Sequence, residues 1–419
     1  MGVFRCICSP FELFFYSIQI YIFPIIKYYC YKFVCCISLF RCCFLYTDND
    51  FNEKNALGEH YEGWDNKIEW RRCYSVKGAT LISNQIKPSD VLQGGIGDCW
   101  LMSAIACLAE YHGPLHNLFD SHSMSTFGKY KIKLYNKSEK RWETIIIDDK
   151  IPFMKTTGKP LFAQCKNGEM WVVLLEKAFA KFVGNYSKLK GGSIAWGLQV
   201  LTGDYVMSFH QSDRSWQKFR MVNMNKEINP QSVTLLGTSE KFNCDETFDI
   251  LKEYDKEGSL LSTYTSCNAL WKHNSGIITK HAYSILRIEE IGNCKLLQLR
   301  NPWGRFEWSG DWSDKSTKWK ENPYVRMRLQ FEDKNDGVFW ISWYDFQSIF
   351  TDIDICHKSF GKHDLILDIH EDVCCGPMIG CIKGCFSFWC CCNGCKALYF
   401  PHKSSQSTLK VKKRTCILL

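Results

Sequence analysis

A cysteine at position 99 has the surroundings of a nucleophile that attacks carbonyl groups. It follows a glycine-rich loop, residues 93–98, and precedes apolar residues at helical spacing, so the sequence predicts a helix that begins beside it. Asp98 is the expected N-cap, which places Cys99 in the first turn. There the unpaired N–H groups and the positive end of the helix dipole favour a thiolate. One face of the helix is expected to pack inward through Trp100, Leu101, Ala104, Ile105 and Leu108.

A thiolate also needs a proton acceptor and a group that orients it. His281 lies in a predicted strand, 279–288, and Asn301 ends a second apolar stretch that is followed by a proline turn. Cysteine, histidine and then asparagine is the chain order of a papain-type nucleophile, base and orienter. The interval from Cys99 to His281 exceeds the roughly 130–150 residues typical of papain, which indicates an insertion between the two halves.

Several separate motifs strengthen this interpretation. The chain contains, in order, QGGIGDCW (93–100), EMWVVLLEKAFAK (169–181), KHAYSIL (280–286) and LRNPWGRFEWSGDWSD (299–314). Together they resemble the protease core of calpains, the intracellular calcium-dependent cysteine proteases, over roughly residues 60–360. The resemblance implies an α+β, two-lobe papain-like fold. Its expected parts are an N-terminal segment and linker (1–59), a helical first lobe (60–203), a β-rich second lobe (204–360) and a tail (361–419).

The same resemblance assigns roles to five residues. Cys99 is expected to be the nucleophile, His281 the general base and acid, and Asn301 the residue that orients the imidazole. Gln93 is expected to supply the side-chain amide of an oxyanion hole, with the backbone N–H of Cys99 as the second donor. Trp303 is expected to shield the hydrogen bond between histidine and asparagine from water. The active site would lie between the lobes, so that a movement of the lobes could switch it.

Calcium is the cofactor that the resemblance implies, with one site in each lobe. The matching acidic positions are Asp90 and Glu169 in the first lobe, and Glu307, Asp314 and Asp336 in the second. Val338 occupies the position of a further carboxylate, and valine offers no ligand oxygen. A hard cation held by fewer charges binds more weakly, so the second site is expected to be weak or lost.

Lys280 is a second departure from the family pattern, because a glycine normally precedes the histidine. A cation beside His281 would disfavour the imidazolium. If the Lys280 side chain points away, the substitution only restricts the backbone. The sequence leaves both interpretations open, and with them the possibility of an inactive, calpain-like interaction protein.

The 24 cysteines are concentrated at the two ends of the chain. Seven precede residue 47 and nine follow residue 373, often as adjacent runs rather than as spaced pairs. This distribution does not suit a secreted disulfide scaffold and favours a reducing, cytoplasmic location. Residues 1–46 and 364–419 each carry a net charge of +3, which leaves little of the total of +8 for the core. Nowhere is a basic patch interleaved with aromatic residues as in nucleic-acid sites, so the charge indicates a membrane surface.

The two ends of the chain differ in how they could reach a membrane. Residues 1–46 are apolar, but their longest uncharged run, 13–26, is too short to span a bilayer and contains a proline. Gly2 permits myristoylation, although Cys6 replaces the preferred Ser or Thr; interfacial attachment through cysteines and a misassigned translation start are the alternatives. Residues 47–59 are polar and are expected to form a linker.

The last four residues, Cys416 to Leu419, match a C-a-a-X box whose terminal leucine predicts geranylgeranylation. The preceding Lys410, Lys412, Lys413 and Arg414 form a basic patch, and palmitoylated cysteines could add a further lipid. The expected location is the cytosolic face of a membrane, and the expected partners are protein substrates. A penta-EF-hand domain is not expected, because the chain contains no EF-hand loop pattern. Zinc binding by the tail cysteines is a weaker alternative. A transglutaminase is disfavoured by Asn301, since aspartate normally completes that site.

Overall fold

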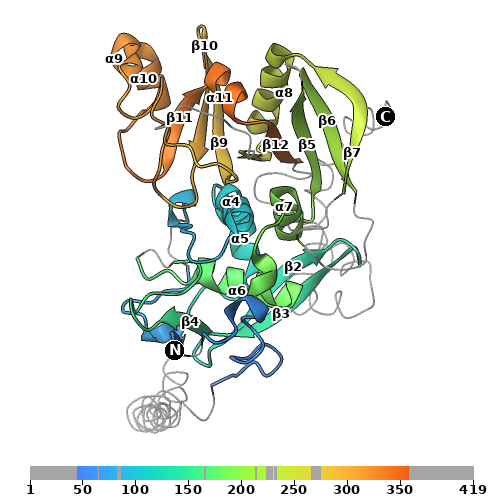
Figure 1. The fold of residues 1–419 in the computed structure, drawn as a ribbon, viewed down its shortest axis with the longest axis vertical. Coiled ribbons are helices and arrows are strands. Elements are labelled where there is room, and N and C mark those ends of the chain that lie inside the picture. The colour runs from blue at the N-terminus through green and yellow to red at the C-terminus, as the bar shows by residue number, and fades with distance from the viewer. Residues whose placement is uncertain are drawn as a thin grey trace, which may run out of the picture.

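The chain folds into two lobes that meet along two buried helices of the first lobe (Figure 1). The computed structural model describes residues 45–64, 66–82, 86–164, 167–212, 215–222, 230, 234–265 and 275–357. The two ends of the chain lie outside these residues, and with them the predicted acylation sites, the cysteines considered for zinc and the C-a-a-X box. Within the described residues, no helix combines the length and the apolar character needed to cross a membrane.

The first lobe is mainly helical. Its helices are α4 (Cys99–Leu108), α5 (His112–Leu118), α6 (Trp171–Val183) and α7 (Ile194–Thr202), with short 3-10 turns η2 (Glu59–Tyr61), η3 (Cys73–Ser75), η4 (Pro88–Asp90) and η5 (Tyr186–Leu189). Two antiparallel pairs complete it: β1 (Ile68–Arg72) with β4 (Lys150–Met154), and β2 (Lys129–Asn136) with β3 (Arg141–Asp148). Helix α6 contains most of the EMWVVLLEKAFAK motif, and β2 and β3 form a hairpin.

The second lobe is built on one antiparallel sheet in the order β11-β10-β9-β8-β12-β5-β6-β7. Its strands are β5 (Tyr205–Ser212), β6 (Ser215–Val222), β7 (Thr234–Phe242), β8 (Leu260–Tyr264), β9 (Ala282–Ile291), β10 (Cys294–Arg300), β11 (Val338–Ser342) and β12 (Asp352–His357). Its helices are α8 (Cys244–Lys256), α9 (Lys318–Glu321), α10 (Pro323–Leu329) and α11 (Trp343–Ile349). The predicted lobe boundary at 203/204 falls in the turn between α7 and β5. The predicted α+β class is confirmed.

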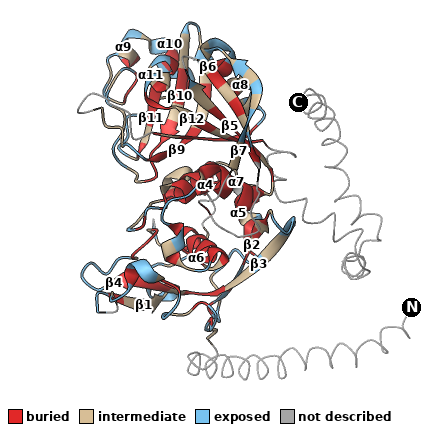
Figure 2. Cartoon of the chain, turned by 45° about the vertical axis from the view of Figure 1, so that its right-hand side comes forward, coloured by how far each residue is buried: buried red, intermediate tan, exposed pale blue. Residues whose placement is uncertain are grey.

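Helix α4 lies at the junction of the lobes and contacts α7 on one side and β8 and β9 on the other. Every residue from Trp100 to Leu108 is therefore buried, whereas the sequence predicted one inward face (Figure 2). Polar contacts also cross the junction. The Ser284 hydroxyl donates to the Ser103 carbonyl (3.0 Å), and the Cys107 thiol donates to the Leu261 carbonyl (3.0 Å). The core of the first lobe thus extends across the junction to residues such as Leu260 and Ala282, while the second lobe has core clusters of its own.

Residues 47–59 are not a linker, and that prediction is wrong. Their few apolar side chains, Phe51, Ala56 and Leu57, are buried in the first lobe. The segment is held by charged groups as well, since the Lys181 ammonium donates to the Asp48 carboxylate (2.6 Å). Polar composition misled the prediction because three well-spaced apolar residues suffice to anchor a short segment.

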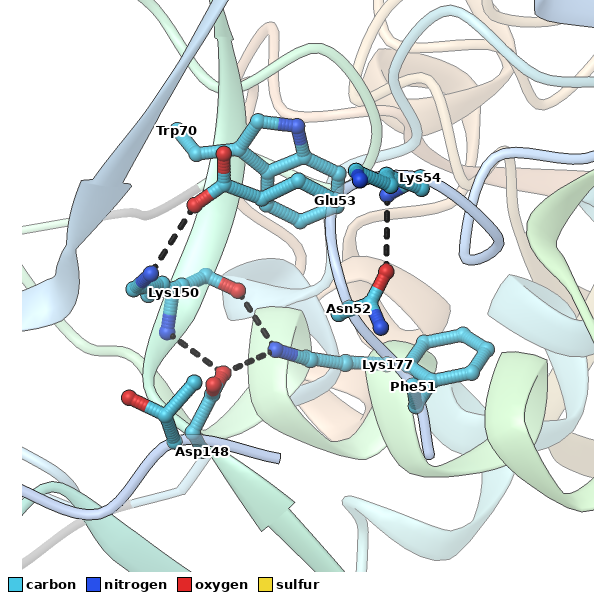
Figure 3. A pocket seen from close by; sticks show the side chains of 9 residues that line it. Phe51, Asn52, Glu53, Lys54, Trp70, Asp148, Lys150 and Lys177 are labelled. Atoms are coloured by element: carbon cyan, nitrogen blue, oxygen red, sulfur yellow. Dashed lines mark hydrogen bonds and ion pairs between the residues drawn. The ribbon is translucent and has the colours of Figure 1, made fainter. Parts of the chain in front are cut away.

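A cavity of about 310 Å³ opens where this segment crosses β4 and α6 (Figure 3). At its floor the buried Lys177 ammonium donates to Asp148 (2.5 Å) and to the Lys150 carbonyl (2.6 Å). At its rim the Lys150 ammonium donates to Glu53 (2.9 Å). Because these charged groups bind one another, the cavity forms part of the scaffold that fixes α6.

Candidate active site

The glycine loop brings the Cys99 helix against residues 160–164 of the first lobe. The Gly95 backbone N–H donates to the Leu161 carbonyl (2.9 Å), and the Gln164 backbone N–H donates to the Leu92 carbonyl (2.9 Å). A Cβ atom on Gly94 would lie only 1.5 Å from the Phe162 carbonyl oxygen, so no other residue fits there. The glycines therefore permit the close packing that fixes the start of α4.

Cys99 is the first residue of α4, and Asp98 is its N-cap residue, as predicted. The Asp98 side chain does not cap the helix, however. Burial raises the pKa of the Cys99 thiol, and the neighbouring Asp98 charge adds to this, while N–H groups of Ala282, Trp100 and Cys99 itself oppose it. The expected thiolate is thus not favoured in this arrangement, because loss of solvent outweighs the helix terminus.

The histidine that was predicted as the base lies directly before β9 and is only 2% exposed. Its Nε2–H donates to Asn301 Oδ1 (2.8 Å), which also accepts the Trp303 backbone N–H (3.0 Å), while Asn301 Nδ2 donates to the Phe306 carbonyl (3.1 Å). Since Asn301 Oδ1 can only accept, the proton of the neutral imidazole is on Nε2. Nδ1 is then the nitrogen that can take a proton from a nucleophile.

The sulfur of Cys99 lies beside this histidine's strand. It is within hydrogen-bonding reach of the backbone N–H of Ala282, the residue that follows His281. Burial lowers the pKa of His281 to about 4, against an opposing contribution from Asn301. With the thiol pKa raised, both groups are neutral near pH 7. The structure thus places a neutral thiol beside the backbone of the residue that follows a neutral His281.

Gln93 and Trp303 connect the two lobes above this pair. The Trp303 indole N–H donates to Gln93 Oε1 (2.8 Å), and its ring centroid lies 4.5 Å from that of His281. Gln93 Nε2 donates to the Ile96 carbonyl (2.7 Å), and the Gln93 side chain also lies near the Asp98 carboxyl. The indole therefore covers the imidazole and also orients the amide that was predicted for the oxyanion hole.

Lys280 affects the backbone rather than the charge at the site. Its side chain is exposed, and its φ of 51° lies in the left-handed region that favours glycine. No contribution from Lys280 appears among the causes that shift the pKa of His281. Lys280 therefore occupies a backbone conformation in which a side chain causes strain.

We expect Lys280→Gly to stabilise the protein by about 0.5–1 kcal/mol, because glycine removes the left-handed strain. Equilibrium unfolding in urea measures this change. Lys280→Ala is the matched control, since alanine removes the charge but keeps the strain. Equal stabilisation by alanine and glycine would show that charge, and not backbone conformation, is responsible.

The predicted calcium ligands of the first lobe lie in separate hydrogen bonds. Asp90 Oδ2 accepts the Lys87 backbone N–H (2.8 Å), and Glu169 Oε2 accepts the Trp171 indole N–H (3.3 Å). Residues 83–85, which would add backbone oxygens, lie outside the described part of the chain. Two buried carboxylates are suitable chemistry for calcium, but these two alone do not make a site.

In the second lobe the three predicted carboxylates lie on two facing loops. Burial, together with the charges of Glu307, Asp333 and Asp336, raises the pKa of Asp314 to about 7. Glu307 Oε1 accepts the Gly337 N–H (2.7 Å), whose carbonyl in turn accepts the Asn301 backbone N–H (2.8 Å). This oxygen-rich, self-repelling group suits a hard cation. Among the described residues, no three ligand side chains are close enough to hold a metal ion.

Arg300 is a residue that motif reasoning missed. It is fully buried, and its Nη2 donates to the Val91 carbonyl of the first lobe (2.6 Å). Burial lowers its pKa to about 10, whereas the charges of Asp336 and Asp90 oppose the shift. One guanidinium therefore faces a predicted calcium ligand from each lobe and precedes Asn301 in the chain. The only sequence feature that could have indicated its importance is its position directly before the NPWG motif.

A cysteine that begins a buried helix, beside a histidine oriented by asparagine on a second lobe, defines a papain-like cysteine-protease site. A model of the calpain family cysteine proteases matches residues 46–357. This chain therefore belongs to the calpain family.

Curated relatives agree with this assignment. The chain is 34% identical to Calpain-type cysteine protease ADL1 of Oryza sativa subsp. japonica, over 69% of this chain and 12% of that protein. It is 29% identical to Calpain-9 of Homo sapiens, over 75% of this chain and 43% of the relative. It is 31% identical to the Calpain-1 catalytic subunit of Bos taurus, over 69% and 38% respectively. The matched region thus spans less than half of each relative.

Proposed function

We propose that this chain is a calcium-dependent cysteine endopeptidase that performs limited cleavage of proteins at the cytosolic face of a membrane. The observation that carries the proposal is the hydrogen bond from His281 Nε2 to Asn301 (2.8 Å), next to the Cys99 sulfur at the lobe junction. It fixes the one tautomer in which the imidazole can deprotonate a thiol.

The reaction is acyl transfer. The Cys99 thiol gives its proton to His281 Nδ1 as the sulfur attacks the peptide carbonyl. The resulting oxyanion accepts hydrogen bonds from Gln93 Nε2 and from the Cys99 backbone N–H. His281 then protonates the leaving amine, and a thioester remains on Cys99. Water, deprotonated by His281, hydrolyses the thioester and regenerates the thiol.

The neutral pair has a consequence for activation. Because burial disfavours both the thiolate and the imidazolium, formation of the ion pair requires closer contact between the two groups or bound substrate. A movement of the lobes could supply this contact, since the sulfur already lies beside Ala282, the residue that follows His281. A calcium-driven movement of the loop at Gly337 would reach Asn301 through one backbone hydrogen bond.

Digestion of casein by the purified full chain, with and without calcium, tests the proposed function. Cleavage that requires calcium and stops after alkylation of Cys99 supports it. An inactive, calpain-like interaction protein is the alternative, favoured by the substituted positions Lys280 and Val338. That alternative predicts no cleavage at any calcium concentration, although Cys99 could still be alkylated.

The second-lobe calcium site offers a sharper test. Val338 begins β11, and its backbone N–H donates to Asp336 Oδ1 (3.0 Å). We expect Val338→Glu to raise calcium affinity roughly tenfold, because the site gains a carboxylate. Calorimetric titration with calcium measures the affinity directly.

Val338→Gln is the matched control for that titration, since glutamine has nearly the same size but no charge. It should change the affinity much less than glutamate does. Unchanged affinity in Val338→Glu would remove the second-lobe site from the proposal, and full activity of the natural chain in excess chelator would remove calcium dependence altogether.

Membrane attachment is proposed from the sequence alone, through the C-a-a-X cysteine Cys416, the adjacent basic patch and acylated cysteines. Intact-mass analysis of the natively expressed protein tests it, and an unmodified mass would exclude the lipids. Protein substrates follow from the proposed reaction.

A further inference from the structure

Two acidic side chains lie beneath the nucleophile with no cation beside them. Asp98, directly before Cys99, and Glu176, in the middle of α6, are both fully buried. The Asp98 carboxyl faces the Glu176 carboxyl and lies near the Gln93 side chain. Within the described part of the chain, neither acid forms an ion pair with Lys, Arg or His, since the next residue on α6, Lys177, is bound to Asp148.

Hydrogen bonding shows that this contact requires a proton. Among the described residues, neither oxygen of Asp98 has a donor in good geometry. Two ionised carboxylates in contact in a buried site repel each other strongly. If one carboxyl is protonated, it donates to the other and satisfies both. The pair therefore holds at least one proton when the lobe is folded.

The surrounding groups agree with a shared proton. Burial raises the pKa of Asp98 and of Glu176, and the Asp98 charge raises that of Glu176 further. The titratable groups that face the pair are Tyr61 of η2, Tyr186 of η5 and the Cys99 thiol. The pKa of each of these groups is raised as well, so they are neutral near pH 7 and none supplies a positive charge.

Glu176 also holds the segment that packs behind the glycine loop. Both of its carboxyl oxygens accept the Ala163 backbone N–H at 3.1 Å. The residues just before Ala163 are those against which Gly94 and Gly95 pack. A shift of Ala163 would therefore displace the loop that carries Gln93, and a shift of Asp98 would displace Cys99 itself.

We propose that Asp98 and Glu176 form a proton-sharing positioning pair that sets the alkaline limit at which Cys99 and the Gln93 loop are held for reaction. The proposal rests on the proposed protease function and deepens it. When alkaline conditions remove the last proton, two adjacent carboxylates repel each other, and the loop and the start of α4 separate. The added charge next to Cys99 also opposes ionisation of the thiol.

The sign of the pH effect follows from linkage. The folded state binds more protons at this pair than the unfolded chain does, because both carboxyl pKa values are raised. The stabilisation is fully present below the ordinary pKa of a carboxyl group. It is lost as the pH rises through the raised values in the folded state.

The test is the rate at which Cys99 reacts with iodoacetamide between pH 5 and 10, followed by peptide mass spectrometry on the full chain. Glu176→Gln keeps an acceptor for the Ala163 amide and a donor for Asp98, but it has no proton to lose. Ionisation of the thiol raises the reaction rate with pH in every variant. In the natural chain we expect the rate to fall below this rise where the pair loses its last proton, and we expect no such departure in Glu176→Gln. We expect Asp98→Asn to accelerate alkylation near pH 7 by about 3- to 10-fold, because the charge beside the thiol is gone.

Glu253→Gln is the matched control, since it removes an exposed carboxylate on α8 and should behave like the natural chain. If Glu176→Gln does not fold, the Asp98→Asn profile decides alone. Profiles of both folded variants that match the control would overturn the proposal. Alkylation needs no peptide hydrolysis, so a chain that fails to cleave casein but shows these profiles loses the protease function and keeps the pair.

Discussion

Replacing Cys99 with serine is expected to lower kcat for peptide hydrolysis by about 10⁴- to 10⁶-fold, the range seen when a catalytic nucleophile is removed. Serine fits the space at the start of α4, but its hydroxyl is far less acidic than a thiol, and the buried His281 is a weak base for it. Rates on a fluorogenic peptide and on casein measure the loss, while thermal unfolding should be nearly unchanged.

Cys107 provides the control on the same helix. Its thiol is buried and donates to the Leu261 carbonyl (3.0 Å), a bond that a serine hydroxyl can also make. Cys107→Ser should therefore retain most of the activity. Similar activity of the Cys99→Ser and natural chains would refute Cys99 as the nucleophile.

Replacing Lys177 with methionine is expected to destabilise the fold by about 3–5 kcal/mol, because it leaves a buried carboxylate without its cation. The Lys177 and Asp148 side chains are 1% and 3% exposed, and their contact is 2.5 Å. Asp148 also accepts backbone N–H groups from Asp48 and Lys150, both at 3.0 Å, so the carboxylate cannot turn to solvent without breaking them. Equilibrium unfolding in urea measures the free energy.

The neighbouring Lys150 offers a comparison with the same change in side chain. Its ion pair with Glu53 is partly exposed, with side chains 29% and 49% accessible, and such pairs contribute about 0–1 kcal/mol. Lys150→Met should therefore cost far less than Lys177→Met. Equal losses for the two variants would contradict the assignment of Lys177 as an anchor of the first lobe.

The types, order and flanking elements of Cys99, His281 and Asn301 predicted a catalytic set. In the structure His281 donates to Asn301, the Cys99 sulfur lies beside Ala282, and β9 begins within a few residues of the predicted strand. The role of residues 47–59 could not be predicted, because their burial depends on partners more than a hundred residues away, such as Lys181.

Electrostatics was the other limit of the sequence. A helix terminus favours a thiolate, and that much is local. The opposing burial of Cys99 depends on packing against residues that are distant in the chain. The strain at Lys280 likewise needs a backbone angle, and the position of Arg300 between Asp90 and Asp336 needs the folded chain. Local sequence patterns do not specify burial, backbone angles or contacts between residues that are distant in the chain.

The complete enclosure of α4 restricts how this molecule can be controlled. Its residues from Trp100 to Leu108 cannot leave this position without exposing apolar surface to water. A regulatory movement of the lobes is therefore expected to tilt the β-rich half around a helix that stays in place. A ligand bound between the two lobes would inhibit the protein without contacting the Cys99 sulfur.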